Sequence, residues 1–328
     1  MDYSIILPVR NGGGYIKQCV ASILAQPGNN YNLIILDSGS TDGTVEWIKA
    51  QKDPRIVFYP SDVPLTIEQN WGRIKSVPRN KWMTIIGHDD LLHPCYLTIM
   101  DALIKKHPEA SLYAPHFDFI DEDGMVIRQS KPMPEVQSAC EFTEKLLLND
   151  IDAVGLVMRS DDYDAVGGFP LYPNLLFADF VIWINLAGIT YKATAPECCL
   201  SYRIHRKSTT TTSNDDKYHA AYDLYIRYLI ALKEKGPCYN EVINKHIGNV
   251  LRSRCLEFSK KLLQTERKYR TTYNSVKALV DKHNMYASML IDHNTLDLAT
   301  IPQIRLARLI DATAIGRKAF LLISKMLR

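Results

Sequence analysis

Short apolar runs alternate with amphipathic segments through the first hundred residues of the chain. Residues 4–9 (SIILPV), 32–36 (NLIIL), 55–59 and 82–86 (WMTII) are rich in β-branched and other apolar residues, which is typical of buried strands. Between the first two runs, apolar residues within 16–24 recur at the spacing of one helix face. Strands and helices that alternate in this way predict a mostly parallel sheet with helices on both faces.

The alternation changes after residue 110. Two strand-like runs within residues 112–128 flank a turn at residues 121–124 (DEDG), and this pattern predicts a β-hairpin inside the parallel order. Hydrophobic spacing then predicts a helix at 141–148, a strand at 153–158, a helix at 178–186 and a strand at 200–205.

From about residue 215 the spacing of apolar residues is helical, and no internal repeat occurs. We therefore expect two parts: an α/β domain over residues 1–210 and a helical, basic C-terminal extension over residues 211–328. The two parts differ in charge. Residues 1–210 hold 19 Lys and Arg against 25 Asp and Glu, a net charge of −6, whereas residues 211–328 hold 20 against 11, a net charge of +9.

Composition narrows the class of protein. With 328 residues, 46% of them hydrophobic and 23% charged, the chain is neither a disordered tail protein nor a collagen-like fibre nor a disulfide scaffold. The acidic first part argues against nucleic acid as a partner, because its overall field repels phosphate. The basic second part suits an anionic surface.

The C-terminal segment 303–328 has two interpretations. It contains six Lys and Arg and one Asp, with Leu, Ile and Phe between them, which fits an amphipathic helix on a membrane surface. Alternatively, it is a helix that packs on the protein and presents a charged outer face. No stretch reaches the ~18 uninterrupted apolar residues of a membrane span, and no secretory signal opens the chain. We therefore expect a cytoplasmic protein, at the inner face of the plasma membrane if 303–328 binds lipid.

Three predicted strand ends carry notable residues, and in open α/β sheets ligands bind at this edge. After the first strand, Gly12 and Gly14 half-fit the dinucleotide-binding pattern, although Lys17 takes the place of its third glycine. Asp37, after the second strand, stands where an acid would bind the ribose of NAD. An NAD(P)-dependent oxidoreductase is therefore one alternative, and a tight turn without ligand is the simpler interpretation of the glycines.

Asp89 and Asp90 follow the fourth strand. Two adjacent carboxylates repel each other, and a divalent cation such as Mg²⁺ or Mn²⁺ removes that cost when substrate phosphates complete its coordination. The simpler interpretation is a solvated strand end in which an Asp caps the helix that begins near Pro94.

Taken in order, several stretches resemble family 2 glycosyltransferases of GT-A fold. They are SIILPVRN, LIILDSGSTDGT, WMTIIGHDDLLHP, VGGFP, LLFADFVIWINLAG and YRIH, which together span residues 3–210. The resemblance implies an enzyme that moves a sugar, with inversion and metal assistance, from a nucleotide-diphosphate donor to an acceptor hydroxyl. It favours a UDP-sugar as donor, a glycan or lipid-linked acceptor, and a role in surface polysaccharide or glycan synthesis.

The resemblance also implies which residues bind the donor. Pro8, Arg10 and Asp37 would line the pocket for the nucleoside base. Arg203 and His205 fall where a late loop of the family closes over the diphosphate.

The remaining implied roles belong to three acids. Asp89 and Asp90 would hold the ribose and the cation, Mg²⁺ or Mn²⁺, that bridges the diphosphate. Asp179 falls where the family places its catalytic base.

Three departures from the family pattern accompany these matches. Ser38 replaces the second Asp of the nucleoside motif, Gly87 replaces the first Asp of the metal motif, and Ala178 replaces the Glu that usually precedes the base. They leave a second alternative, a nucleotide-sugar-binding protein that has lost turnover.

Overall fold

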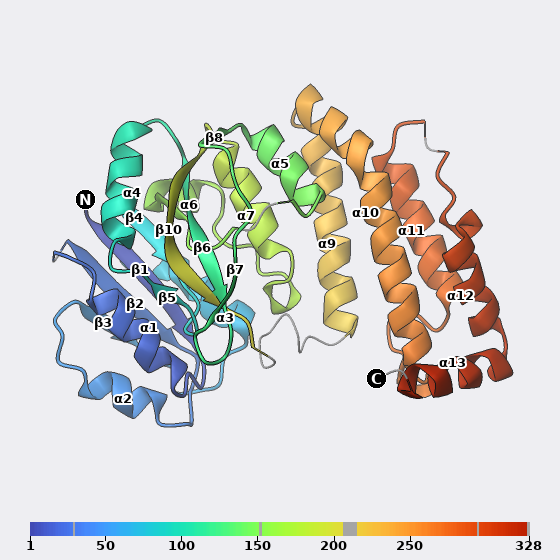
Figure 1. Cartoon of the computed structure of the whole chain (residues 1–328), viewed down its shortest axis with the longest axis horizontal. Helices are drawn as coiled ribbons and strands as arrows, with labels where there is room; N and C mark the ends of the chain where they lie inside the picture. Colours follow the sequence, from blue (N-terminus) through green and yellow to red (C-terminus); the bar gives the residue numbers. More distant parts are fainter. Residues whose placement is uncertain (29, 151–152, 206–214, 294, 327–328) are drawn as a thin grey trace. The chain divides into compact units, whose positions relative to one another are not determined.

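The chain forms two compact units, Met1–Ser213 and Asn214–Arg328 (Figure 1). The first unit is α/β and the second is helical, so the expected fold class is confirmed. The predicted boundary between residues 210 and 211 lies outside the described residues. The computed structural model describes residues 1–28, 30–150, 153–205, 215–293 and 295–326.

The first unit is organised around one sheet, whose strands run in the spatial order β3-β2-β1-β4-β9-β6-β10-β5. The strands are β1 (Tyr3–Val9), β2 (Tyr31–Asp37), β3 (Ile56–Tyr59), β4 (Trp82–Ile85), β5 (Leu91–Leu92), β6 (Leu112–Ile120), β7 (Val126–Gln129), β8 (Val136–Gln137), β9 (Val157–Arg159) and β10 (Lys192–Arg203). β1 pairs in parallel with β2 and β4, and β2 pairs in parallel with β3. The predicted hairpin is formed by β6 and β7.

Helices connect and cover these strands (Figure 1). In the first unit they are α1 (Tyr15–Leu24), α2 (Thr44–Ala50), α3 (Ile67–Gly72), η1 (Arg73–Ser76), α4 (Tyr96–Lys106), α5 (Ala139–Leu147), α6 (Ser160–Ala165), η2 (Pro173–Leu175) and α7 (Ala178–Ala187). All seven side chains of β1 are buried, as expected of a central strand covered on both faces. Ile5 and Leu7 belong to one apolar cluster with Ile16 and Val20 of α1 and Met100 of α4, which fixes both helices against the sheet.

One predicted strand is shorter than expected. The apolar run at 153–158 forms a strand only as β9, because Gly155 has a φ of 61°, which a strand does not accommodate. A Cβ on Gly155 would lie 2.3 Å from Leu200 Cδ1, so the glycine also permits close packing of β10.

The second unit consists of helices and short 3₁₀ turns. These are α9 (Asp215–Lys233), α10 (Pro237–Gln264), η3 (Arg267–Tyr269), α11 (Val276–Leu290), η4 (Leu298–Thr300), α12 (Pro302–Ala312) and α13 (Ala314–Met326). Its core includes Leu251 and Cys255 of α10 and Leu279 of α11, all fully buried. None of the described helices combines the length and apolar composition that crossing a bilayer needs.

Candidate active site

The loops that follow β1 and β2 are tied together by side-chain hydrogen bonds. Asn11 Oδ1 accepts from the Thr41 amide at 2.8 Å, and the Asn11 amide donates to Ser40 Oγ at 2.7 Å. Asn11 has a φ of 51°, a conformation that asparagine tolerates better than most residues. Parallel pairing of β1 with β2 brings these two loops to one edge of the sheet. The predicted grouping of the strand ends is therefore observed.

The glycine run after β1 uses its amides within the protein. The Gly12 amide donates to Thr44 Oγ1 at 3.0 Å, and the Gly13 amide donates to Asp42 Oδ2 at 2.9 Å. A Cβ on Gly12 would lie 2.7 Å from Ile16 Cβ, so this glycine lets α1 pack against the strand. The tight-turn interpretation explains these contacts without a ligand.

Of the three residues expected around the nucleoside base, one is exposed. Arg10 projects from the end of β1, and its guanidinium lies 3.4 Å from the Leu65 carbonyl. Pro8 is buried within β1. Asp37 is fully buried and accepts from the amides of Gly39 and Ser40 at 2.8 and 3.1 Å. In this structure the Asp37 carboxylate holds the shape of its own loop.

Asp89 and Asp90 converge on the Cα of Gly87. A Cβ added to Gly87 would lie 2.6 Å from Asp89 Oδ1 and 2.9 Å from Asp90 Oδ2. Because Gly87, the glycine that departs from the family pattern, has no side chain, two carboxylate oxygens can reach the space that a Cβ would otherwise take. This space is lined by oxygen ligands of the kind that Mg²⁺ and Mn²⁺ prefer.

Asp90 is a buried acid beside another acid. Its side chain is 3% exposed, and Oδ1 accepts from the Arg203 amide at 2.9 Å. Burial, together with the charge of Asp89, raises the pKa of Asp90 well above its usual range. A bound cation would reverse this penalty, because an adjacent positive charge favours the ionised form.

His205 lies against the same acid pair. Its Nε2 is 2.7 Å from Asp89 Oδ2, and its ring lies 5.5 Å from the ring of Tyr15, centre to centre. The loop after β10 therefore reaches the loop after β4. Imidazole and carboxylate side by side can share either a proton or a cation.

Arg203 is buried beside these acids. It is 2% exposed, its ring neighbour is Tyr15, and its amino groups donate to the carbonyls of Asp121 and Glu122 and to Gln18 Oε1. Its Nε donates to the Asp89 carbonyl at 2.9 Å. The side chain thus fastens the acid-bearing loop to the β6–β7 hairpin and to α1.

Asp179 begins α7 near the acid pair. Phe177, just before the helix, has a φ of 63°, which turns the chain sharply at this point. Asp179 Oδ1 accepts from the Phe180 amide at 3.0 Å, and burial raises the pKa of the carboxyl to about 6. A carboxyl with this pKa is well suited to accept a proton near neutral pH.

Tyr202 connects the three acids and was not predicted. Burial, and after it the charges of Asp90, Asp89 and Asp179, raise the pKa of its phenol to about 12. All three carboxylates therefore lie within electrostatic reach of one side chain. The only sequence signal was its position in YRIH, within the strand predicted at 200–205.

A metal site can be judged from the donors present. Within the described residues no group of three or more His, Cys, Asp or Glu is arranged to hold a metal ion. Asp89 and Asp90 nevertheless fit a divalent cation as protein ligands, since their oxygens face the space at Gly87. Such a partial set is typical of Mg²⁺ sites that substrate phosphates complete.

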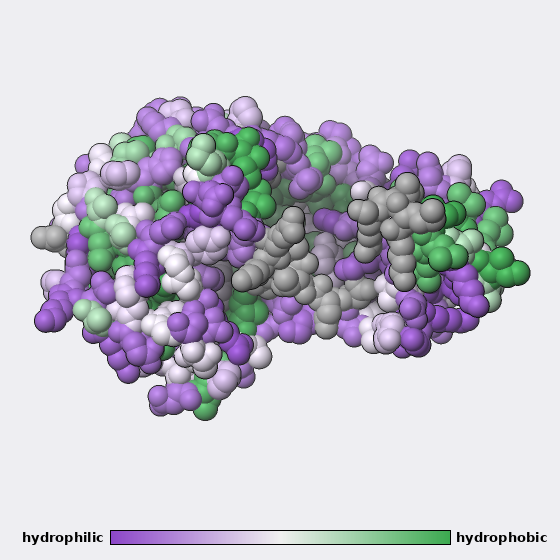
Figure 2. Space-filling model, turned by 60° about the horizontal axis from the view of Figure 1, so that its bottom comes forward, coloured by the Kyte–Doolittle hydropathy of each residue, from purple (hydrophilic) through white to green (hydrophobic). Residues whose placement is uncertain are grey.

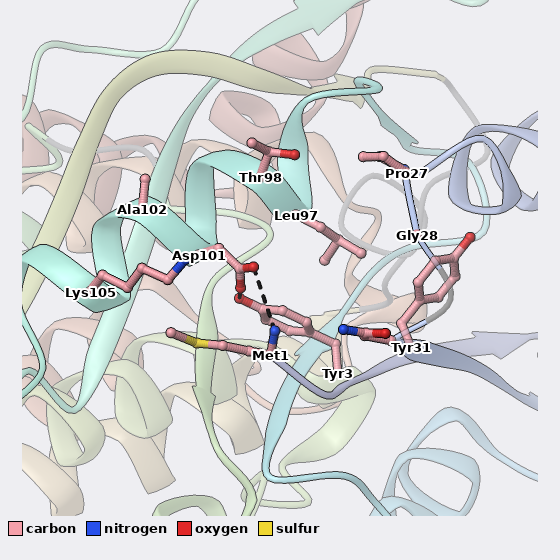
Figure 3. A pocket seen from close by; sticks show the side chains of 11 residues that line it. Met1, Tyr3, Pro27, Gly28, Tyr31, Leu97, Thr98, Asp101, Ala102 and Lys105 are labelled. Atoms are coloured by element: carbon pink, nitrogen blue, oxygen red, sulfur yellow. Dashed lines mark hydrogen bonds and ion pairs between the residues drawn. The ribbon is translucent and has the colours of Figure 1, made fainter.

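A separate cavity of about 320 Å³ lies at the other end of the strands (Figure 3). It is lined by Tyr3 and Tyr31, which begin β1 and β2, and by Leu97 and Asp101 of α4. The Tyr3 hydroxyl donates to Asp101 Oδ1 at 2.7 Å. Because the acids follow the opposite ends of the strands, this cavity is not part of the candidate active site.

Comparison with known proteins identifies relatives of the first unit. Residues 4–163 match glycosyl transferase family 2. An uncharacterized glycosyltransferase of Rickettsia conorii is 31% identical over 39% of this chain and 22% of its own length. Another, of Rickettsia typhi, is 24% identical over 69% of this chain and 72% of its own length.

Among solved structures, that of Staphylococcus aureus TarS 1-349 in complex with UDP-GlcNAc matches all of this chain and 93% of the TarS chain, with a TM-score of 0.68 and 12% identity. At that identity the match shows the fold alone, which is of the GT-A-like type expected from the sequence. Over residues 4–163 the chain therefore carries a domain of glycosyl transferase family 2, a family of enzymes that transfer sugars.

Proposed function

We propose that the protein transfers a sugar from a nucleotide-diphosphate donor to an acceptor hydroxyl with inversion at the anomeric carbon. The observation that carries this proposal is the arrangement of Asp89, Asp90 and Asp179 within electrostatic reach of Tyr202, with His205 against Asp89. The site thus offers a place for a diphosphate and its counterion close to a carboxyl that can accept a proton.

A UDP-sugar is the favoured donor. TarS, whose fold this chain shares, has been solved in complex with UDP-GlcNAc and with UDP. The exposed Arg10 and the loop held by Asp37 border the place where the base would lie, with Pro8 beneath. UDP-GlcNAc is therefore the first donor to test.

A divalent cation, Mg²⁺ or Mn²⁺, would bind between Asp89 and Asp90 at the space beside Gly87. When bound, it neutralises charge that develops on the departing diphosphate. His205 would hold the orientation of the Asp89 carboxylate, and Arg203 would hold the loop that carries both acids. We thus assign Arg203 a positioning role.

Asp179 would accept the proton of the acceptor hydroxyl. A pKa of about 6 keeps this carboxyl ionised at neutral pH, yet basic enough to take a proton as the new bond forms. Attack from the side opposite the diphosphate inverts the anomeric centre in one displacement, as in inverting hydrolysis with the acceptor in place of water.

The acceptor would be a glycan or a lipid-linked sugar, and the product would belong to surface polysaccharide or glycan synthesis. We also propose that the protein acts in the cytoplasm. Neither the acceptor nor this location is needed for the donor chemistry, which can be tested alone.

The oxidoreductase alternative requires phosphate to meet free amides at the glycine turn. Here the amides of Gly12 and Gly13 donate to Thr44 and Asp42. The alternative of an inactive binding protein predicts donor binding without turnover, and only an activity measurement separates it from the enzyme.

The test is a screen of nucleotide sugars, scored by release of nucleoside diphosphate with and without Mn²⁺. Thermal shift with UDP, GDP and NAD in the same buffers gives binding independently. Metal-dependent stabilisation by UDP with turnover of a UDP-sugar supports the proposal. Stabilisation by NAD alone, or UDP binding without turnover of any donor, contradicts it.

A further inference from the structure

The last helix of the second unit presents its apolar side to solvent. No described side chain of α13 is buried, and Ile315, Leu322 and Ile323 are 83%, 64% and 57% exposed. These positions lie on one side of the helix, because residues seven apart share a face. A helix normally turns its apolar face inward, so this orientation indicates a surface that something else covers.

Helix α12 extends the same kind of surface. Ile304 and Ala307 point inward, whereas Leu306 and Leu309 are 58% and 63% exposed. Figure 2 shows hydrophobic residues gathered on the surface of the second unit. The exposed Leu and Ile of α12 and α13 are here called the α12–α13 surface.

An apolar groove adjoins this surface. It has a volume of about 410 Å³ and lies between α10, α12 and α13, with Leu263, Leu306, Ile310 and Phe320 among its lining residues. Glu257 at its rim is paired with Arg254 at 2.7 Å. The groove is therefore lined mainly by apolar residues, and the negative charge of Glu257 is balanced by Arg254.

The charges of the two helices are one-sided. In the sequence of α12 and α13 the cations are Arg305, Arg308, Arg317, Lys318 and Lys325, and the one acid is Asp311. Asp311 is buried and bonded to Arg270, so it does not offset these cations at the surface. Exposed apolar side chains with cations between them fit an anionic lipid bilayer. Its acyl chains can surround the apolar side chains, and its anionic head groups attract the cations.

A second copy of the chain fits this surface less well. A symmetric contact places the same patch on both sides, so the cations of one copy would face a patch that carries the same cations. With no exposed acid on the described parts of α12 and α13 to pair with them, these charges would repel. We propose that the α12–α13 surface binds the anionic face of a lipid bilayer, with Ile315, Leu322 and Ile323 inserted among the acyl chains. This inference does not depend on the proposed sugar transfer.

The experiment is co-sedimentation of the full-length protein with vesicles of phosphatidylcholine alone or with about 30% phosphatidylserine. Wild-type protein is expected to sediment with the mixed vesicles, and more weakly at high salt. The variant I315E/L322E should bind at least about tenfold more weakly, because both side chains lose their apolar environment. The variant R305E/K318E should lose a similar factor together with the salt dependence.

The matched controls are I189E, which changes an exposed isoleucine of the first unit, and K105E, which reverses an exposed lysine of α4. Both should sediment like wild type. Absence of wild-type binding, equal binding to both vesicle types, or equal losses in the controls overturns the proposal. So does a wild-type oligomer in light scattering that I315E/L322E converts to a monomer, because a second copy then covers the surface.

Thermal unfolding identifies variants that merely fail to fold. Nucleotide-sugar turnover without vesicles is measured on the same samples, and I315E/L322E should keep it. If wild type binds vesicles but turns over no donor, the proposed function fails while this inference stands. If the protein turns over a donor but binds no vesicles, this inference fails while the proposed function stands.

Discussion

Two buried carboxylates, one in each unit, are held in opposite ways. Asp311 in the second unit accepts from the Arg270 guanidinium at 2.7 Å and from the Val276 amide at 2.8 Å. Asp90 at the edge of the sheet is similarly buried but accepts from backbone amides, with a second acid beside it. Among the described residues, no cationic side chain forms an ion pair with Asp90.

We interpret Asp311 as a structural acid and Asp90 as the acid of the proposed site. In the helical unit the fold itself supplies the opposite charge, which makes the pair part of the packing. At the sheet edge the fold leaves a deficit of positive charge, and it does so where Asp89, His205 and Asp179 are also gathered. A deficit of this kind raises pKa values in the free protein and favours a cationic ligand.

The largest expected effect comes from breaking the structural pair. D311N should lower the free energy of unfolding by about 3–5 kcal/mol, because Arg270, 1% exposed, then remains buried without its partner. Urea denaturation followed by circular dichroism measures this. D281N is the control: Asp281 forms an exposed pair with Lys277, so the change should be under about 0.5 kcal/mol. Equal effects of the two substitutions would remove the distinction drawn above.

Asp179 tests the functional side of the comparison. D179N should lower turnover about 10²–10⁴-fold while donor affinity is kept, because the proton acceptor is lost but the diphosphate site is not. The same substitution should raise Tm at pH 7, since it removes a carboxylate whose ionisation burial opposes. D161N, in the first turn of α6, is the matched control for an acid at a helix start. Wild-type turnover in D179N would refute the assignment.

Substitution of Asp90 should weaken metal binding but should change the stability of the fold only slightly. D90N is expected to weaken Mn²⁺-dependent UDP binding about 10–100-fold, because one of two carboxylate ligands is lost. Without metal its free energy of unfolding should change by less than about 1 kcal/mol, since an amide oxygen can still accept from the Arg203 amide. Thermal-shift titrations with and without Mn²⁺ report both quantities. If D90N were severely destabilised without metal, Asp90 would be a structural acid like Asp311.

The pH dependence sharpens the role of Asp179. Its carboxyl has a raised pKa of about 6, so the proton acceptor is ionised above this pH and protonated below it. We therefore expect kcat/KM to fall about tenfold per pH unit below 6 and to be level just above it. The residual kcat/KM of D179N should not show this fall below pH 6. If kcat/KM of D179N still falls below pH 6, another titrating group causes the fall.

The smallest expected effect concerns Gly87. G87A places a methyl group 2.6 Å from Asp89 Oδ1 and 2.9 Å from Asp90 Oδ2, so both carboxylates must move. Because side-chain ends can shift, we expect a loss of only a few-fold in Mn²⁺-dependent UDP affinity. G14A is the control, since a Cβ there meets no atom within 4 Å. Unchanged affinity in G87A would mean that the space beside Gly87 is not where the cation binds.

The sequence determined the order of strands and helices and the edge at which polar residues gather. Buried strands reveal themselves by apolar runs, and parallel neighbours bring their ends together, so Asp37 and the Asp89–Asp90 pair were predicted to share one edge. The hairpin around residues 121–124 and the helix predicted at 178–186 could also be predicted from the sequence, because both depend on local spacing.

Tertiary structure alone decided what each polar group contacts. Nothing in the sequence indicated that the guanidinium of Arg203 donates to the carbonyls of Asp121 and Glu122, which are some 80 residues away along the chain. Likewise, the spacing of apolar residues in α13 is the same whether that face packs inward or outward. Only the position of the helix exposes Ile315 and Leu322. Local sequence fixes periodicity, but partners and orientation depend on which distant segments the folded chain brings together.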